Sequence, residues 1–173
     1  MRSRADKVAY CAVFTAIGLI LSYVEALIPI NLLIPIPGFK LGLANLAVMI
    51  AFFSLGYGYA AAVSLCRILL TALLFGSVTS FWFSLTGGIL ALAAILLYKL
   101  ILCRFCGAIG MSVMMAAMHN IGQCLVCSIL FGYYVLTFYL PMLLFISLVT
   151  GSLTGIVIHR LLKIKFLIKD SSI

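Results

Sequence analysis

The sequence predicts an all-α integral membrane protein, a bundle of six transmembrane helices. Of its 173 residues, 66% are hydrophobic and 8% are charged, whereas a soluble domain is about half apolar and a quarter charged. The apolar residues form continuous runs of helix length, not the short strands of alternating polarity that build membrane barrels. Since one crossing takes about 20 apolar residues, we expect a single transmembrane domain over residues 1–173.

Glycine, proline and charged residues divide the chain into six predicted helices. We expect them at about 8–28, 41–55, 57–75, 80–102, 107–131 and 137–159. The second is short for a full crossing, so it is expected to be broken, tilted or extended into the segment of Pro35 and Pro37. The first follows a basic stretch, as a signal peptide does, but it is long and no clear cleavage pattern follows it, so we expect it to be retained.

The basic residues predict the orientation. If both termini are cytoplasmic, nine of the eleven Lys and Arg residues lie on the cytoplasmic side, as the positive-inside rule requires. These are Arg2, Arg4, Lys7, Lys99, Arg104, Arg160, Lys163, Lys165 and Lys169. Residues 160–173 then form a basic cytoplasmic tail. The net charge of +8 is interpreted as a topology signal and an attraction to anionic membrane lipid, and we expect no nucleic-acid partner.

Four cysteines have a spacing that is typical of zinc sites in soluble proteins. They are Cys103, Cys106, Cys124 and Cys127. If the residues between the two pairs are helical, the pairs lie about 25 Å apart, whereas thiolates that share a zinc ion lie about 2.3 Å from it. We therefore expect no metal site. Buried cysteines usually behave as small apolar residues, and a redox role for Cys124 and Cys127 is the alternative.

Polar side chains inside a bilayer mark the candidate site. An ionisable group there costs about 2.5–3.5 kcal/mol, so it normally faces a cavity, a partner or a substrate path. With the orientation above, seven polar residues are predicted at middle or outer depth: Glu25, Lys40, Asn45, Arg67, His119, Asn120 and Gln123. Their common depth on separate helices favours a substrate-binding site.

Helical spacing arranges some of these residues in two stripes, since residues three or four apart share a helix face. One stripe is Ser64, Arg67 and Thr71, and the other is Ser112, Ala116, His119, Gln123 and Cys127. We expect the stripes to face each other across a cavity open to the outside, with Lys40 and Glu25 at its mouth. Its basic residues would favour an anionic ligand, because arginine binds phosphate or carboxylate through two parallel hydrogen bonds.

Each polar residue also has a structural interpretation. Lys40 can extend its amine to the lipid headgroups. Arg67 can form an ion pair with Glu25. The three polar residues of the fifth helix, His119, Asn120 and Gln123, can hydrogen-bond across helices and so hold the bundle together.

Small residues form two further stripes that would let helices approach closely. One is Ala5, Ala9, Ala12 and Ala16 on the first helix, and the other is Ser147, Gly151 and Gly155 on the sixth. Packing inside the bundle and docking of a partner explain either stripe equally well.

The sequence lacks the residues that several kinds of catalytic chemistry need. The three acidic residues, Asp6, Glu25 and Asp170, do not form the aspartate cluster that prenyl-diphosphate chemistry needs to hold Mg²⁺. The sequence contains no phosphate-binding loop of the GxxxxGK[ST] type and no GxSxG nucleophile motif. We therefore expect neither an enzyme nor a cofactor, and the energy for any uphill transport would come from a partner or an ion.

Two sequence stretches and the helix layout resemble a known family. "PGFKLGLANL" at 37–46 and "HNIGQ" at 119–123 resemble the Gx transporter family, whose members are also labelled heptaprenyl diphosphate synthase component I. The resemblance covers nearly the whole chain. That family is similar to the S-components of energy-coupling factor (ECF) transporters, which are six-helix vitamin-capture proteins. In these, an alanine-xxx-alanine pattern on the first helix docks a T-component that carries two ATPases, and Ala12 and Ala16 match that pattern.

The resemblance implies a multi-pass protein of the bacterial plasma membrane that takes up a small anionic, vitamin-like or isoprenoid-like molecule, energised by a partner ATPase module. A prenyl diphosphate and a flavin phosphate are among the candidates. The family's other label implies an alternative: a non-catalytic accessory subunit beside the prenyl diphosphate synthase catalytic subunit that makes the isoprenoid tail of menaquinone.

Overall fold

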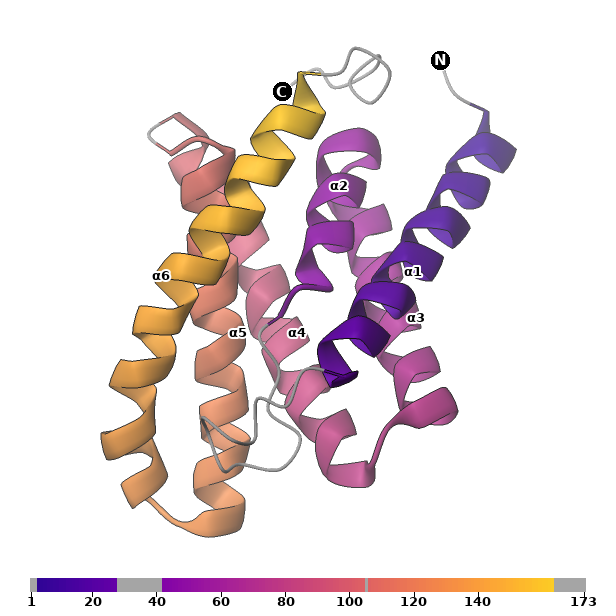
Figure 1. Cartoon of the computed structure of the whole chain (residues 1–173). Coiled ribbons are helices and arrows are strands. Elements are labelled where there is room, and N and C mark those ends of the chain that lie inside the picture. Colours follow the sequence, from indigo (N-terminus) through magenta and orange to yellow (C-terminus); the bar gives the residue numbers. More distant parts are fainter. Residues whose placement is uncertain (1–2, 28–41, 105, 164–173) are drawn as a thin grey trace.

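The protein folds as a bundle of α-helices, shown by a computed structural model that describes residues 3–27, 42–104 and 106–163 (Figure 1). Within these ranges there is no strand. The elements are α1 (Arg4–Leu27), α2 (Asn45–Leu55), α3 (Tyr57–Phe75), α4 (Val78–Leu100), the 3-10 turn η2 (Leu102–Arg104), α5 (Ala108–Phe131) and α6 (Tyr134–Leu162). Within the described ranges, the predicted all-α class and the six α-helices are confirmed.

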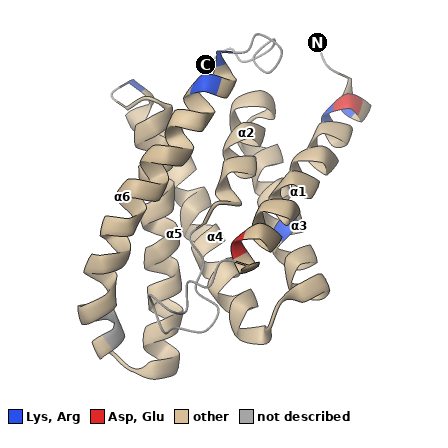
Figure 2. Cartoon of the chain, viewed as in Figure 1, with Lys and Arg blue, Asp and Glu red and all other residues tan. Residues whose placement is uncertain are grey.

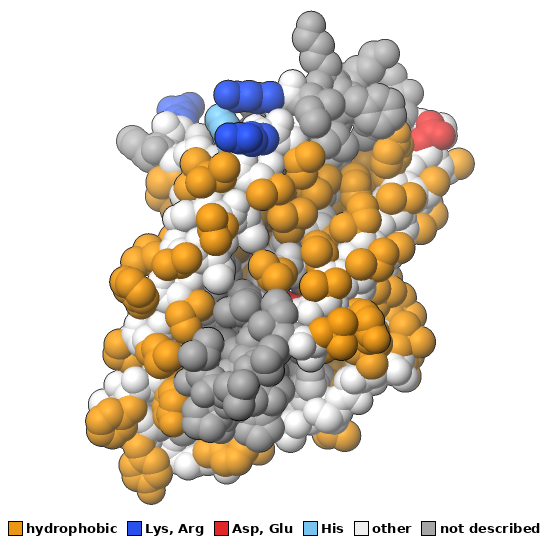
Figure 3. All heavy atoms as spheres, in the orientation of Figure 1, with side chains coloured by type: hydrophobic (Ala, Val, Ile, Leu, Met, Phe, Trp, Pro, Cys, Tyr) orange, Lys and Arg blue, Asp and Glu red, His pale blue; other side chains and the backbone are white. Residues whose placement is uncertain are grey.

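Five of the helices, α1, α3, α4, α5 and α6, are long and apolar enough to cross a membrane. Apolar side chains cover much of the visible surface of the bundle, as hydrocarbon contact requires (Figure 3). These features make the chain a multi-pass membrane protein. The sixth crossing stays a prediction, because α2 has 11 residues and is about 16 Å long, half of the hydrocarbon thickness.

Two helices, α1 and α2, begin at other residues than predicted. α1 begins at Arg4, four residues before the predicted start, because Ser3 and Asp6 form a reciprocal cap: the Asp6 N–H donates to Ser3 Oγ at 3.1 Å, and the Ser3 N–H donates to Asp6 Oδ2 at 2.9 Å. α2 begins later than predicted, at Asn45. Gly42, just before it, has a φ of +83°, a left-handed conformation that favours glycine.

The start of α1 and the end of α6 lie at the same end of the bundle (Figure 1). Basic positions lie at that end, with an acidic position at the start of α1, and acidic and basic positions also lie part-way down the bundle (Figure 2). This asymmetry agrees with the distribution on which the orientation was predicted. The cytoplasmic assignment of that end stays a prediction.

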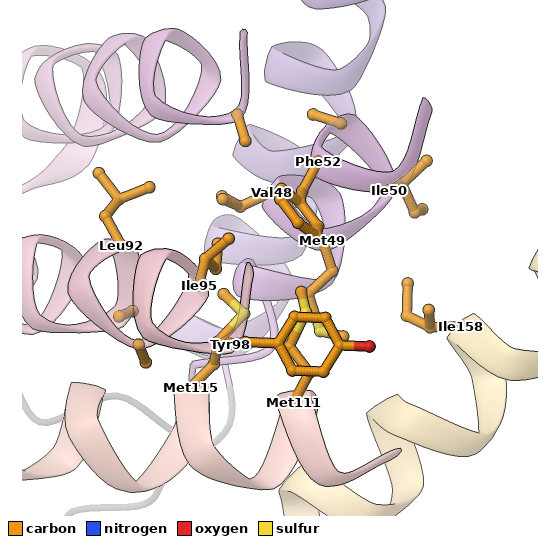
Figure 4. Close-up of a cluster of buried hydrophobic side chains, with 14 of the residues drawn as sticks. Val48, Met49, Ile50, Phe52, Leu92, Ile95, Tyr98, Met111, Met115 and Ile158 are labelled. Carbon is orange, nitrogen blue, oxygen red and sulfur yellow. The ribbon is translucent and has the colours of Figure 1, made fainter. Parts of the chain in front are cut away.

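α2 forms the centre of the core although it is the shortest helix. It buries Asn45 and the whole run from Ala47 to Phe52. Its apolar side chains meet those of α4 and α5 in one cluster (Figure 4). Members of this cluster are Val48, Met49, Phe52, Ile95, Met111 and Met115. The start of α2 is thereby held inside the bundle, beside the polar residues described next.

The two stripes of small residues have different environments. On α6, Ser147, Gly151 and Gly155 are buried. A Cβ added to Gly151 would lie 2.6 Å from Val113 Cα of α5, so this stripe serves packing between α5 and α6. On α1, all four stripe alanines are exposed: Ala5, Ala9, Ala12 and Ala16. The α1 stripe therefore does not pack inside the bundle.

Candidate functional site

Arg67 of α3 lies buried among three helices. Its side chain is 3% exposed, and the predicted stripe partners Ser64 and Thr71 are buried with it. The aliphatic part of the side chain passes Gly18 of α1, where an added Cβ would lie 2.8 Å from Arg67 Cδ and 3.4 Å from Ala47 Cβ of α2. Gly18 therefore provides the space through which the guanidinium group reaches the interior between α1 and α2.

The guanidinium group of Arg67 has one described hydrogen bond and two buried nitrogens without one. Its Nη1 donates a hydrogen bond of 3.3 Å to Ser22 Oγ of α1. Its Nε and Nη2 are buried and have no hydrogen-bond partner among the described residues. Nε–H and one Nη2–H point the same way along one edge of the planar group, and this edge binds the two oxygens of a carboxylate or phosphate. A buried unsatisfied donor costs about 1–3 kcal/mol, so this edge is suited to an anionic group.

Gly42 brings together residues from three helices. Its N–H donates a hydrogen bond to Oε1 of Glu25, which is 2% exposed at the end of α1. A Cβ added to Gly42 would lie 3.1 Å from Asn45 Nδ2 and 3.4 Å from His119 Cδ2. The absence of a side chain at Gly42 thus allows α2 to begin between Glu25 of α1 and His119 of α5.

His119 and Gln123 of α5 act as a pair. Their Nε2 atoms share a hydrogen bond of 2.8 Å, and both side chains are buried, at 2% and 1% exposure. The imidazole ring lies against Gly87 of α4, where an added Cβ would be 2.7 Å from His119 Cε1. The structure therefore brings His119 to the start of α2, as well as to α4.

Three further predicted site residues are Asn120, Glu25 and Lys40. Asn120 faces α6, because its Nδ2 donates to Ser147 Oγ at 2.7 Å and to the Leu143 carbonyl at 3.2 Å. It follows His119 directly, so it lies about 100° farther around the helix and holds α5 to α6. Glu25 is buried near the end of α1, and the cavity mouth predicted beside it stays a prediction. Lys40 lies outside the described residues.

The cavity beside Gly42 is small. It has a volume of about 10 Å³ and lies among α2, α5 and α6, with Asn45, Ser112 and Thr154 in its lining. That volume holds about one water molecule. Ser112 Oγ and Thr154 Oγ1 share a hydrogen bond of 2.7 Å, so Ser112, predicted to face α3, instead contacts α6. Asn45 Nδ2 has no partner among the described residues.

The four cysteines with zinc-like spacing lie in separate environments. Cys103 is exposed and Cys106 is partly buried at the turn after α4, while Cys124 and Cys127 are buried in an apolar cluster with Phe83 and Leu143. Among the described residues, no group of three or more His, Cys, Asp or Glu side chains could hold a metal ion.

Sequence reasoning missed three positions that form the site: Gly18, Ser22 and Gly42. Ser22 precedes Glu25 by three residues and so shares its helix face, a signal that could have been found. Gly18 and Gly42 were not recognisable, because their role depends on which side chain of another helix lies against them.

Comparison with known families shows which family the chain belongs to. The sequence model described as heptaprenyl diphosphate synthase component I matches residues 14–161. The chain belongs to this family. The component I match runs from α1 into the last turn of α6, so it contains every described residue of the site. No curated protein and no solved structure matches the chain.

Proposed function

We propose that this component I protein is a non-catalytic membrane subunit that binds a small molecule through an anionic group at Arg67. The observation that carries the proposal is the buried Nε and Nη2 edge of the guanidinium, which has no partner among the described residues. The charged group is held within the bundle by Ser22. Charged side chains at such depth normally serve a ligand or partner.

The start of α2 supports anion binding at the same place. A helix carries partial positive charge at its N-terminus, and short helices that begin inside a membrane protein typically direct this end at anionic substrate groups. α2 begins at the buried Asn45, whose Nδ2 is a further donor without a partner among the described residues.

We infer that the protein works as the membrane accessory subunit of a prenyl diphosphate synthase. The family match favours this role. The chain's three acidic residues, Asp6, Glu25 and Asp170, do not form the carboxylate cluster that would hold Mg²⁺ against a diphosphate, so the catalytic step would belong to a partner subunit. The bound molecule would then be a precursor, product or regulator of that partner.

A second candidate is uptake of the bound molecule across the bacterial plasma membrane, with the chain acting as an S-component docked to an ATP-driven ECF module. The exposed alanine stripe of α1 favours it. Ala12 and Ala16 lie on the surface, where small side chains allow a partner helix to approach closely. Both candidates use the same binding site and differ in the partner.

Two measurements test these proposals. Native mass spectrometry of the purified protein should detect a bound small molecule that is lost in Arg67→Ala and His119→Ala and kept in the control Arg104→Ala, whose side chain is exposed on η2. Retention of the molecule in both site variants would contradict the binding proposal. Purification from the host in mild detergent then identifies the partner: a prenyl synthase subunit supports the accessory role, and a T-component with its ATPases supports uptake.

A further inference from the structure

The turn between α4 and α5 contains two cysteines in a C-x-x-C pattern that the proposed function does not use. Cys103 lies in η2 and is exposed. Cys106 directly precedes Gly107, the N-cap of α5, and is partly buried against the main hydrophobic cluster. An accessible thiol next to a second, resolving thiol is the arrangement typical of redox-sensing cysteines. The two side chains therefore have the exposures that thiol–disulfide exchange requires.

The backbone of the turn brings the two cysteines to the same side. The Cys106 N–H donates a hydrogen bond of 2.9 Å to the Leu102 carbonyl, the bond that closes one α-helical turn. Residues three apart in a helical turn have Cα atoms about 5–6 Å from each other, and a disulfide needs about 4.4–6.8 Å between its Cα atoms. The Cβ atoms, about 5–6 Å apart in such a turn, must approach to about 3.8 Å, so a small adjustment of the turn closes the bond.

The surroundings of the turn leave room for this reaction. A Cβ added to Gly110 would lie 3.0 Å from Cys106 Cβ and 3.5 Å from Cys106 Sγ, so the Cys106 side chain lies over the first turn of α5 and Gly110 leaves space beside it. A Cβ added to Gly107 would meet nothing within 4 Å. Arg104, between the two cysteines, is exposed, and its positive charge attracts an anionic reactant. A small anionic disulfide can therefore reach the turn.

We propose that Cys103 and Cys106 form a redox-active dithiol that closes reversibly into a disulfide, with a low-molecular-weight disulfide as the oxidant. The exposed Cys103 loses its proton and attacks one sulfur of the oxidant, whose S–S bond breaks and whose other half leaves and takes up a proton. Cys106 then loses its proton and attacks Cys103 Sγ, which displaces the second half of the oxidant as a thiol. Two cysteine thiols are thereby oxidised, and the oxidant is reduced to two thiols. This inference goes beyond the proposed binding function and does not depend on it.

The chain contains a matched comparison for this site. Cys124 and Cys127 have the same C-x-x-C spacing, but each is 2% exposed and lies in an apolar cluster. Because thiol–disulfide exchange depends on access to the thiol, only the first pair should react. With the orientation predicted from the basic residues, the turn of Cys103 and Cys106 faces the cytoplasm, where disulfides are usually transient and redox-sensing.

The test treats the purified, reduced full chain in detergent with glutathione disulfide, alkylates the remaining thiols and locates each modification by peptide mass spectrometry. We expect a disulfide between Cys103 and Cys106 that dithiothreitol reverses. Cys106→Ser should stop at a mixed disulfide of glutathione on Cys103, because the resolving thiol is missing. Cys103→Ser should slow the reaction with the oxidant about tenfold or more, because only the partly buried Cys106 remains in the turn. In the control Cys124→Ser, the rate should equal that of the wild-type protein.

Several results would overturn the proposal. One is a turn whose two thiols stay unreacted, and another is a stable glutathione adduct on Cys103 of the wild-type protein without closure to Cys106. An unchanged rate in Cys103→Ser would exclude attack by the exposed thiol. A disulfide that forms between Cys124 and Cys127 as fast as in the turn would refute the argument from exposure.

Discussion

Arg67 of α3 donates a hydrogen bond of 3.3 Å from Nη1 to the Ser22 hydroxyl of α1, and this contact orients the guanidinium without using its two-donor edge. A side chain of this length would otherwise lose about 2 kcal/mol of rotamer entropy on being fixed by a ligand. Ser22, together with the Gly18 gap, holds the group in place beforehand. The contact therefore joins two helices and also fixes the position of the edge that we propose for binding.

Replacement of Ser22 by alanine should lower both stability and ligand retention. The change leaves Nη1 buried without this acceptor, which we expect to cost about 1–3 kcal/mol. Thermal unfolding in detergent measures the loss of stability. Ser54→Ala is the matched control: Ser54 Oγ is buried with no partner among the described residues, so its removal should be neutral or stabilising. Equal destabilisation by the two substitutions would show that the Ser22 contact has no special role.

Gly87→Ala should displace the His119 ring. A Cβ at Gly87 would lie 2.7 Å from His119 Cε1 and Nδ1, and overpacking of this kind costs about 1–3 kcal/mol. We expect lower thermal stability and weaker ligand retention. In the control Gly58→Ala, the added Cβ meets nothing within 4 Å in α3, so the better helix propensity of alanine should stabilise the protein by up to about 1 kcal/mol. A wild-type ligand level in Gly87→Ala would exclude His119 from the site.

The helical architecture could be predicted from the sequence because the bilayer leaves few alternatives. Long apolar runs must satisfy their backbone internally, so the existence of the helices followed from composition and their approximate ends from glycine, proline and charge. The capping pair of Ser3 and Asp6 was readable in the sequence, yet it was overlooked, which placed the start of α1 too late. The start of α2 depends on Gly42, whose φ of +83° no apolar periodicity reveals.

The site was predictable only in part, because helical spacing identifies a face but not its neighbour. The α3 residues Ser64, Arg67 and Thr71, which helical spacing placed on one face, are all buried, and the cavity that they were predicted to line stays a prediction. For α5, spacing placed His119 and Gln123 on one face, and the structure joins them by a hydrogen bond. Asn120 was predicted at a similar depth, but the position of α6 gives it different hydrogen-bond partners. The position of α6 relative to α5 is set by the tertiary structure, which helical spacing does not reveal.

Asn120→Leu should separate packing from binding. It removes the hydrogen bonds to Ser147 and the Leu143 carbonyl, and hydrogen bonds between membrane helices contribute about 0.6 kcal/mol on average, with a maximum near 1.7. We expect a modest fall in thermal stability with the bound small molecule retained in native mass spectra. In His119→Leu, by contrast, we expect the bound small molecule to be lost. Loss of ligand in Asn120→Leu at intact stability would return Asn120 to the binding site.

The exposed α1 stripe predicts that a substitution there can prevent partner binding without destabilising the isolated protein. In the double variant Ala12→Leu and Ala16→Leu, the added side chains point to the lipid, because both alanines are exposed. The stability of the isolated protein should stay within about 0.5 kcal/mol of wild type, while a partner helix that needs a small-residue surface can no longer approach. Co-purification of the partner should therefore be lost.

Gly151→Ala provides the contrasting case on the other small-residue stripe. Its Cβ would lie 2.6 Å from Val113 Cα, and a backbone neighbour cannot move aside as a side chain tip can, so the isolated protein should lose about 1–3 kcal/mol. Thermal unfolding of both variants and quantitative mass spectrometry of co-purified subunits compare the two stripes. If the α1 double variant keeps its full complement of partner, docking through Ala12 and Ala16 is wrong, and the accessory or uptake partner must bind another face of the bundle.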